Sequence, residues 1–240
     1  TPGTEYKVYV SITNDPNYED VTNGLYIESA STMAYPTESW SSHADTSWYN
    51  DVDTEFTITT PEQLAGVSLL GGNFAGKTIL LGADIDMTGY QWVPIDDFAG
   101  TFDGQNHTVR GMVCTSSNYS AKGLFASTRS QAGAMIANVR VENSFFMDGS
   151  SVGGIVGILV NGSVTNCVSD AVVVNGKRTG GIAGYAGGSI ISECISYGKI
   201  VQKHGWGSNL DMIAYVGGIV GFMDTAKAKN CANFASIYSD

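Results

Sequence analysis

The chain has little positive charge. Only 12 of its 240 residues are Lys or Arg, against 23 Asp and Glu, which gives a formal net charge of −11. A protein that binds nucleic acid or an anionic membrane surface presents a patch of positive charge to the phosphates. The few lysines are too scattered to form such a patch, so the composition argues against both partners.

Long apolar runs and metal-binding motifs are also missing. No stretch of 18 apolar residues occurs, so no segment is predicted to insert into a membrane. The four cysteines show no C-x-x-C pair and the three histidines no H-E-x-x-H, so we predict no metal and no cofactor. The chain begins with Thr1 rather than Met and shows no signal peptide, and we expect it to be a processed piece of a longer protein.

Glycine, in contrast, is abundant, and its pattern repeats. Three stretches share the form G-G-I-x-G, and each is followed 13 residues after its second glycine by a cysteine (167 − 154, 194 − 181 and 231 − 218). A weaker fourth copy precedes them at 122–126. The three stretches are Val152–Gly157, Thr179–Gly184 and Val216–Gly221. A fixed-period repeat predicts a solenoid, in which each module packs on its neighbours.

The repeat also predicts the kind of solenoid. Each module contains three short strand-like runs, such as 154–160, 163–168 and 171–174. Aligning the modules on their second run places five residues at one inward position, at intervals of 27, 28, 27 and 37 residues: Met112, Val139, Cys167, Cys194 and Cys231. We therefore predict an all-β fold, a right-handed parallel β-helix of about 27 residues per coil. The stacked cysteines are expected to be free, buried thiols.

One helix is predicted ahead of the repeat. Thr60-Pro-Glu-Gln63 forms a capping box with Pro at the first helical position, and Gly71-Gly72 ends the helix. We expect this short helix to cover the open first coil. Residues 1–38 lie outside the repeat and are predicted to be an N-terminal β extension or the end of a preceding module. The solenoid is predicted to span 39–240 and to continue beyond the chain.

The last interval between modules is ten residues longer than the others (37 − 27), with the excess near 202–211. Insertions in solenoids leave as loops and frequently bind ligands. His204, Trp206 and Asn209 are therefore the candidate binding residues. Trp206 could stack on a sugar ring or a protein surface, or it could fold back onto the solenoid.

Catalytic candidates are weak. The only dense set of carboxylates runs from Asp84 to Asp103, in early turns where Asp is ordinary turn chemistry. A β-helical polysaccharide lyase or hydrolase using this set, with Lys77 or Arg110 as the basic residue, is the alternative to a non-enzymatic chain. Ser151 fits the pattern G-x-S-x-G, but it lies before a strand rather than in a strand-to-helix turn. We predict no catalytic residue.

Several of these segments resemble the GLUG-motif repeats of bacterial surface proteins. The resemblance is carried in order by 56–65, 92–95, 98–109, 123–126 and 152–157, with Ala126 where glycine is usual, and it covers about 45–240. It implies an extracellular or cell-surface module of a larger secreted or surface-anchored bacterial protein, with a spacer or adhesive role and a host protein or carbohydrate as ligand. Such repeats also accompany immunoglobulin-cleaving metallopeptidases, so an accessory segment of a secreted peptidase is a further alternative.

Overall fold

The computed structural model describes residues 5–10, 25–31, 35–128, 133–202 and 214–239. The chain divides into two compact units, Thr1–Tyr35 and Pro36–Asp240, close to the division at 38/39 that the sequence suggests. In the first unit, β1 (Glu5–Val10) and β2 (Leu25–Ser31) pair in antiparallel fashion. The second unit carries the repeat.

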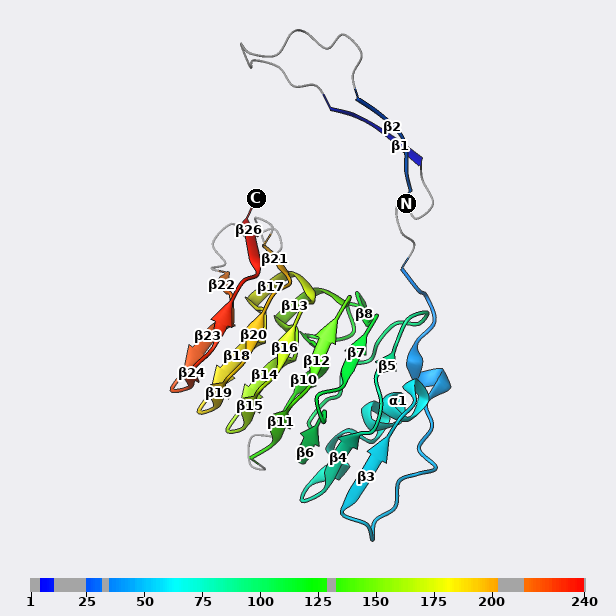
Figure 1. The fold of residues 1–240 in the computed structure, drawn as a ribbon, viewed down its shortest axis with the longest axis vertical. Helices are drawn as coiled ribbons and strands as arrows, with labels where there is room; N and C mark the ends of the chain where they lie inside the picture. Colours follow the sequence, from blue (N-terminus) through cyan, green and yellow to red (C-terminus); the bar gives the residue numbers. More distant parts are fainter. Residues whose placement is uncertain (1–4, 11–24, 32–34, 129–132, 203–213, 240) are drawn as a thin grey trace. The chain divides into compact units, whose positions relative to one another are not determined.

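The second unit is built from parallel sheets with one short α-helix, so the predicted all-β class is confirmed (Figure 1). Its strands form four sheets in the described residues. The first contains β3 (Glu55–Ile58), β4 (Thr78–Leu81), β6 (Thr101–Asp103), β11 (Met135–Ala137), β15 (Ser163–Thr165), β19 (Ile190–Ser192) and β24 (Lys227–Lys229). The second contains β5 (Ile85–Asp86), β7 (Thr108–Arg110), β12 (Arg140–Glu142), β16 (Val168–Ser169), β20 (Ile195–Ser196) and β25 (Ala232–Asn233).

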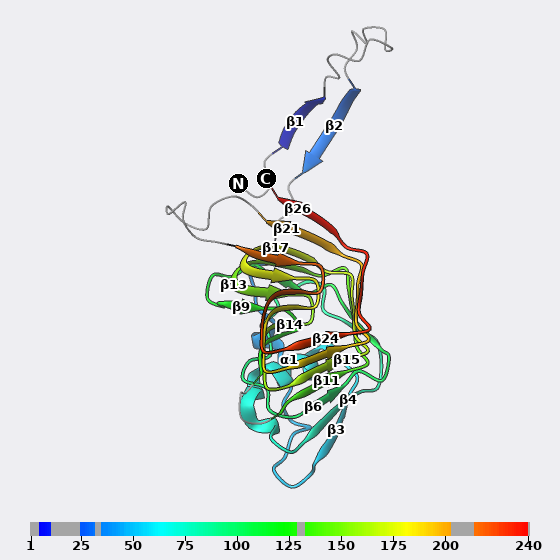
Figure 2. The ribbon, with the colours of Figure 1, turned by 90° about the vertical axis from the view of Figure 1, so that its left-hand side faces the viewer.

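The other two sheets complete each turn of the chain. The third contains β8 (Val113–Cys114), β9 (Ala121–Lys122), β13 (Phe145–Gly153), β17 (Val172–Gly180), β21 (Lys199–Gln202), β22 (Tyr215–Gly217) and β26 (Ser236–Ser239). The fourth contains β10 (Phe125–Ser127), β14 (Val156–Val160), β18 (Ala183–Gly187) and β23 (Val220–Asp224). From β6 onward the chain visits the four sheets in this order and then returns to the first (Figure 2).

The two central turns, β11–β14 and β15–β18, therefore have four strands each, not the three that the sequence suggests. In the turns before and after them the third sheet contributes two strands, β8 and β9 or β21 and β22. The run 163–168 divides into β15 and β16 because Asn166 lies between them with φ +50°. Asparagine tolerates this left-handed conformation better than most residues, and the chain bends there. Asn138 and Asn230 make the same bend in other turns, with φ +54° and +52°.

The period of the repeat is 27 residues only in the central turns. Phe145 of β13 lies opposite Val172 of β17, an offset of 27 (172 − 145). The offset between β4 and β6 is 23 (101 − 78), and between β6 and β11 it is 34 (135 − 101). In the shorter early turn, isolated bridges at Gln91, Ile95 and Phe98 take the place of strands.

Close packing of backbone on backbone explains the glycine motif. A Cβ atom on Gly181 would lie 1.9 Å from Ser196 Oγ and 2.4 Å from the Gly218 carbonyl oxygen. One turn earlier, a Cβ on Gly154 would lie 1.9 Å from Ser169 Oγ. Neighbouring turns are thus in contact at Gly154 and Gly181, the second glycines of the first two motifs, where no larger side chain fits.

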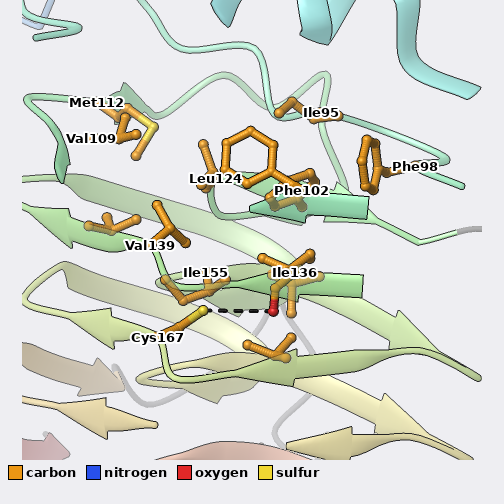
Figure 3. Packing of buried hydrophobic residues seen from close by; sticks show 14 of the residues in the cluster. Ile95, Phe98, Phe102, Val109, Met112, Leu124, Ile136, Val139, Ile155 and Cys167 are labelled. Carbon is orange, nitrogen blue, oxygen red and sulfur yellow. Dashed lines mark hydrogen bonds between the residues drawn. The ribbon is translucent and has the colours of Figure 1, made fainter. Parts of the chain in front are cut away.

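Inward side chains stack into one continuous core. Phe102, Ile136, Val164 and Ile191 lie opposite one another in the first sheet, and all four are fully buried. Figure 3 shows Phe102 and Ile136 among the packed side chains of this core. Like residues on neighbouring parallel strands are about 4.8 Å apart, so each core side chain contacts its counterparts above and below.

The predicted column of stacked inward residues is present, but one of its five predicted members is wrong. Val168, Ile195 and Ala232 are aligned, so the preceding residues Cys167, Cys194 and Cys231 are aligned too. Each sulfur lies 3.2–3.3 Å from the carbonyl oxygen two residues before it. Figure 3 shows Cys167 directed into the core. Val139 belongs to this column, because the Val168 amide donates to its carbonyl.

Met112 does not belong to the cysteine column. Arg140 lies opposite Thr108, which places His107 rather than Met112 opposite Val139. The Met112 carbonyl instead accepts from Phe145 N, at the following bend of the chain. The sequence alignment assumed a constant period of about 27 residues, but this turn has an offset of 32 (140 − 108).

The predicted helix is confirmed as α1 (Pro61–Leu70). Its N-cap Thr60 accepts a hydrogen bond from Gln63 N, and Gly71 ends it with φ +48°. Leu64 is fully buried in the core. The helix lies between β3 and β4 in the chain, followed by the 3-10 turn η2 (Gly71–Phe74), and it packs against the 3-10 turn η1 (Trp40–His43). Its role in covering the first coil stays a prediction. Within the described ranges, no helix is long and apolar enough to cross a bilayer.

Candidate functional site

The predicted binding residues lie in the insertion of the last turn. His204, Trp206 and Asn209 fall outside the described residues. The two ends of the insertion are defined, because β21 ends at Gln202 and β22 begins at Tyr215, both in the third sheet. The described surface that adjoins the insertion in sequence is therefore the one around Tyr215.

Four side chains form a cluster there, which we call the Arg178 cluster. It consists of Arg178 on β17, Tyr185 on β18, Tyr215 on β22 and Phe222 on β23. The Tyr185 and Phe222 rings are stacked, with centroids 5.9 Å apart and planes at 10°. The Tyr215 ring meets Phe222 edge-on at 4.7 Å. The Arg178 guanidinium carbon lies 5.1 Å from the Tyr185 centroid and 5.6 Å from that of Phe222.

Strand register brings these residues together. Tyr215 is the neighbour of Arg178 in the third sheet, and Phe222 is the neighbour of Tyr185 in the fourth. β17, β18, β22 and β23 are neighbours in the last two turns (Figure 1). One turn earlier the equivalent positions hold Ser151 and Ile158. The cluster is thus a feature of the two turns that flank the insertion, not of the repeat.

Within the described residues, Arg178 has no acidic partner. It is half-buried, and its Nε is buried without a hydrogen-bond partner in the described part of the chain. None of the ion pairs of the described residues includes it. A buried donor left unpaired costs about 1–3 kcal/mol, and attraction between the cation and the two rings offsets this cost. The rings therefore hold a positive charge that no carboxylate in the described part of the chain neutralises.

The cluster is open to solvent at one side. Tyr215 is 36% exposed, while Tyr185 and Phe222 are half-buried. Exposed aromatic rings next to a fixed guanidinium can pack on the apolar face of a ligand and donate hydrogen bonds to an anionic group. This combination of groups is what a small polar ligand requires of a surface site.

A second exposed aromatic pair lies at another bend. Tyr197 and Phe234 stack with centroids 5.3 Å apart, and they are 47% and 65% exposed. No ring or cation–π contact between this pair and Arg178 exists in the described residues. Phe234 therefore provides an exposed aromatic residue away from the Arg178 cluster, for use as a control.

The early carboxylates bind partners of their own. Asp84 accepts hydrogen bonds from Thr108 N at 2.9 Å and His107 Nδ1 at 3.1 Å. Asp86 accepts from the Thr88 hydroxyl at 2.6 Å and Arg110 Nε at 3.1 Å. The bond from Thr108 N chiefly lowers the pKa of Asp84, and the Thr88 hydroxyl chiefly lowers that of Asp86. Lowered pKa values suit charged turn residues better than a general acid.

The later members of the set behave in the same way. Asp96 accepts from the Ser127 hydroxyl, and Asp103 accepts from Asn138 Nδ2 and from Gln105. Among the described residues no group of three or more His, Cys, Asp or Glu side chains could hold a metal ion. Asp84 and Asp86 lie near one cation, Arg110, but Asp96 and Asp103 bind Ser127, Asn138 and Gln105 instead. A lyase or hydrolase centre requires carboxylates that converge on one site, and these hydrogen bonds hold the four carboxylates at separate places.

The two basic candidates for that chemistry are already engaged. Lys77 Nζ donates to the carbonyl oxygens of Asn50, Asp51 and Asp53 at 3.3, 3.2 and 2.6 Å. Arg110 is paired with Asp86 at 3.1 Å. Both side chains hold neighbouring segments together.

The remaining nucleophiles are buried, except Cys231, which is half-buried where the sequence predicted a buried thiol. Ser151 is fully buried in β13, and its Oγ has no hydrogen-bond partner among the described residues, so no base activates it. The four cysteines are unbridged. Burial raises the pKa of Cys114 to about 11. The pKa of Cys194 is also raised, chiefly by its hydrogen bond to Cys167 and then by burial. The Cys114 and Cys194 thiols therefore stay protonated at neutral pH.

Sequence reasoning missed one further buried group, Lys122. Its side chain is fully buried, and its Nζ donates to the Met147 carbonyl. Burial lowers its pKa. Lys122 lies at the inward position that Val152 and Thr179 occupy in the next two turns. A lysine at this position tethers the bend at Met147.

Comparison with known proteins gives one informative match. No protein-family model matches the chain, and no curated protein matches it. Among solved structures, a Bacteroides ovatus chain described as a "putative immunoglobulin A1 protease" is similar, with a TM-score of 0.53 and 21% sequence identity. The match covers 77% of this chain and 67% of that one. At this identity it shows a shared fold and nothing about activity.

Proposed function

We propose that residues 39–240 form a right-handed parallel β-helix of the GLUG type. Three observations support this: the cyclic order of the four sheets, the in-register columns of core residues, and glycine motifs that let successive turns touch. Such a coil gives length and rigidity, because each turn is packed on the turns before and after it.

In this proposal the chain is a non-enzymatic module of a bacterial protein that acts outside the cell or at its surface. It serves as spacer and as adhesive surface, and its ligand is a host protein or a carbohydrate. The observation that carries the ligand-binding role is the Arg178 cluster, whose Tyr215 follows the insertion with Trp206 in the sequence. The early carboxylates weigh against the alternative of a polysaccharide lyase or hydrolase, because Asp84, Asp86 and Asp103 already accept hydrogen bonds from neighbouring structural residues.

A second function is favoured by the similar solved structure. Because that protein is described as a "putative immunoglobulin A1 protease", this chain could serve as an accessory segment of a secreted peptidase that acts on an immunoglobulin. Binding of immunoglobulin A1 by this chain in the absence of proteolysis would support that function. Binding of glycans without immunoglobulin would support the adhesive one.

The test is a binding screen of the chain against a glycan array and a panel of host extracellular proteins that includes immunoglobulin A1. We expect at least one ligand, and we expect Trp206→Ala and Tyr215→Ala each to weaken its binding at least tenfold. Phe234→Ala is the matched control, because it removes an exposed aromatic ring away from the cluster. Equal binding by all three variants would contradict a site at the insertion, and no binding at all would contradict the adhesive role.

A further inference from the structure

The Arg178 cluster holds an unneutralised positive charge in a protein with an excess of negative charge. The formal net charge is −11, so carboxylates are available to pair with almost any arginine. Arg140 and Arg110 do pair with acidic residues, at 3.2 and 3.1 Å. Arg178 has aromatic neighbours instead. An arginine held in this way, in an acidic chain, is suited to an anion that comes from outside.

The position of the guanidinium leaves its terminal groups available. Its Nε is buried, but Nη1 and Nη2 are not among the buried unpaired atoms of the described residues, and no hydrogen bond engages them. Contact with an aromatic face uses the π surface of the guanidinium and leaves the N–H groups in its plane free. Two parallel N–H donors match the two oxygens of a carboxylate.

The surroundings favour a ligand with a single negative charge. Lys177 is the adjacent cation, and in β17 it points to the opposite face of the strand from Arg178. One guanidinium matches one carboxylate, whereas a phosphate carries nearly two charges at neutral pH. The overall negative charge of the chain would also repel a polyanion. The three rings beside Arg178 offer apolar contact area for the C–H face of a sugar.

We propose that the Arg178 cluster binds a carboxylate-bearing sugar, either a uronic acid or a sialic acid. The sugar carboxylate accepts hydrogen bonds from the Arg178 Nη groups, and the ring packs on Tyr215, the most exposed aromatic side chain of the cluster. The inference rests on the proposed ligand-binding role of this surface and names the class of ligand. It makes Arg178 the residue that selects acidic over neutral sugars.

The experiment compares matched pairs of soluble sugars by titration calorimetry. Methyl β-glucuronide is compared with methyl β-glucoside, and 3′-sialyllactose with lactose, so that the two pairs distinguish a uronic from a sialic acid. The proteins are the unchanged chain, Arg178→Gln, Arg178→Lys and Lys177→Gln. Lys177→Gln is the matched control, because it removes the same charge from the adjacent residue. Circular dichroism verifies that every variant is folded.

We expect the unchanged chain to bind one acidic sugar at least tenfold more tightly than its neutral partner. Arg178→Gln should abolish this preference, Arg178→Lys should retain only part of it, and Lys177→Gln should leave it within twofold. The affinity for the acidic sugar should fall as salt is added, because an exposed charge pair is screened.

The results that would overturn the acidic-sugar inference differ from those that would overturn the adhesive role. Equal binding of acidic and neutral sugars, or a preference that Arg178→Gln leaves intact, would overturn the inference while the ligand-binding role stands. Absence of sugar binding together with a host-protein ligand sensitive to Tyr215→Ala would do the same. If neither sugars nor host proteins bind, both proposals are wrong.

Discussion

Alanine at Gly181 tests whether successive turns touch at the glycine motif. The new Cβ would lie 1.9 Å from Ser196 Oγ, 2.7 Å from Ser196 Cβ and 2.4 Å from the Gly218 carbonyl oxygen. The serine hydroxyl can rotate away. The Gly218 carbonyl oxygen moves only if the turns separate, and Ser196 Cβ moves only with the backbone of β20. Cβ contacts below 3.0 Å are essentially never observed in proteins. Overpacking of this kind costs roughly 1–3 kcal/mol, and two fixed contacts place Gly181→Ala at about 3 kcal/mol.

The assay is thermal and urea unfolding followed by circular dichroism. For a unit of this size, about 3 kcal/mol corresponds to a decrease in Tm of roughly 6–12 °C. Gly76→Ala is the control, since a Cβ there meets nothing within 4 Å and costs only the strain of φ +73°, about 1 kcal/mol. Adding Ser196→Gly to Gly181→Ala should recover about 1 kcal/mol, because one of the two fixed contacts is removed.

The reasoning would be refuted by a Gly181→Ala variant as stable as Gly76→Ala. That result would mean that the turns do not approach within backbone contact at this position. Failure of Ser196→Gly to recover any stability would locate the cost elsewhere than at the contact between Gly181 and Ser196.

Three further predictions concern single side chains. Glu193 occupies the bend where other turns have asparagine and has φ +57°, so Glu193→Asn should raise the free energy of unfolding by about 0.5–1 kcal/mol, measured by urea unfolding. Thr88→Val removes the main hydrogen bond that lowers the pKa of Asp86, so this pKa should rise toward its ordinary value in an NMR titration; an unchanged pKa would contradict that cause. Because the pKa of Cys114 is raised from 9.0 to about 11 in the folded chain, its contribution to stability is present below pH 9 and is lost between pH 9 and 11. The free energy of unfolding should therefore decrease between pH 9 and pH 11 in both proteins, but the decrease should be roughly 2–3 kcal/mol smaller in Cys114→Ala. Equal decreases in the two proteins would refute this.

Much of the stacking could be predicted from the sequence because the repeat is local and regular. The spacing of Gly154, Gly181 and Gly218 from the cysteines aligned β16, β20 and β25 correctly. The same spacing misplaced Met112, because it carries no information about extra residues in an earlier turn. Periodicity finds neighbouring turns only where their length is constant.

The number of strands in each turn was harder to predict. A bend that needs a single residue in the left-handed conformation, such as Asn166, interrupts a strand without changing its apolar alternation. Strand propensity thus predicts a single strand that spans 163–168, where the structure has two strands in different sheets. Asparagine before Val139, Cys167 and Cys231 was the signal for the bend, and Glu193 takes its place before Cys194.

The sequence analysis did not find the Arg178 cluster, although the positions of its residues relative to the glycine motifs were visible. Tyr185 and Phe222 each follow the second glycine of their motif by four residues, and Arg178 and Tyr215 each directly precede their motif. Aligned modules therefore show aromatic residues in the last two turns only. The sequence does not show that these two columns face each other, because that depends on how the third and fourth sheets meet at the glycines.

The most direct test of the stacked turns is the pattern of NOEs among methyl groups of Ile136, Val164 and Ile191. These residues are successive neighbours in the first sheet. Strong NOEs are predicted between Ile136 and Val164 and between Val164 and Ile191, where strands are about 4.8 Å apart. None is predicted between Ile136 and Ile191, at about twice that distance. A missing NOE between Val164 and Ile191, or a strong one between Ile136 and Ile191, would contradict the stack.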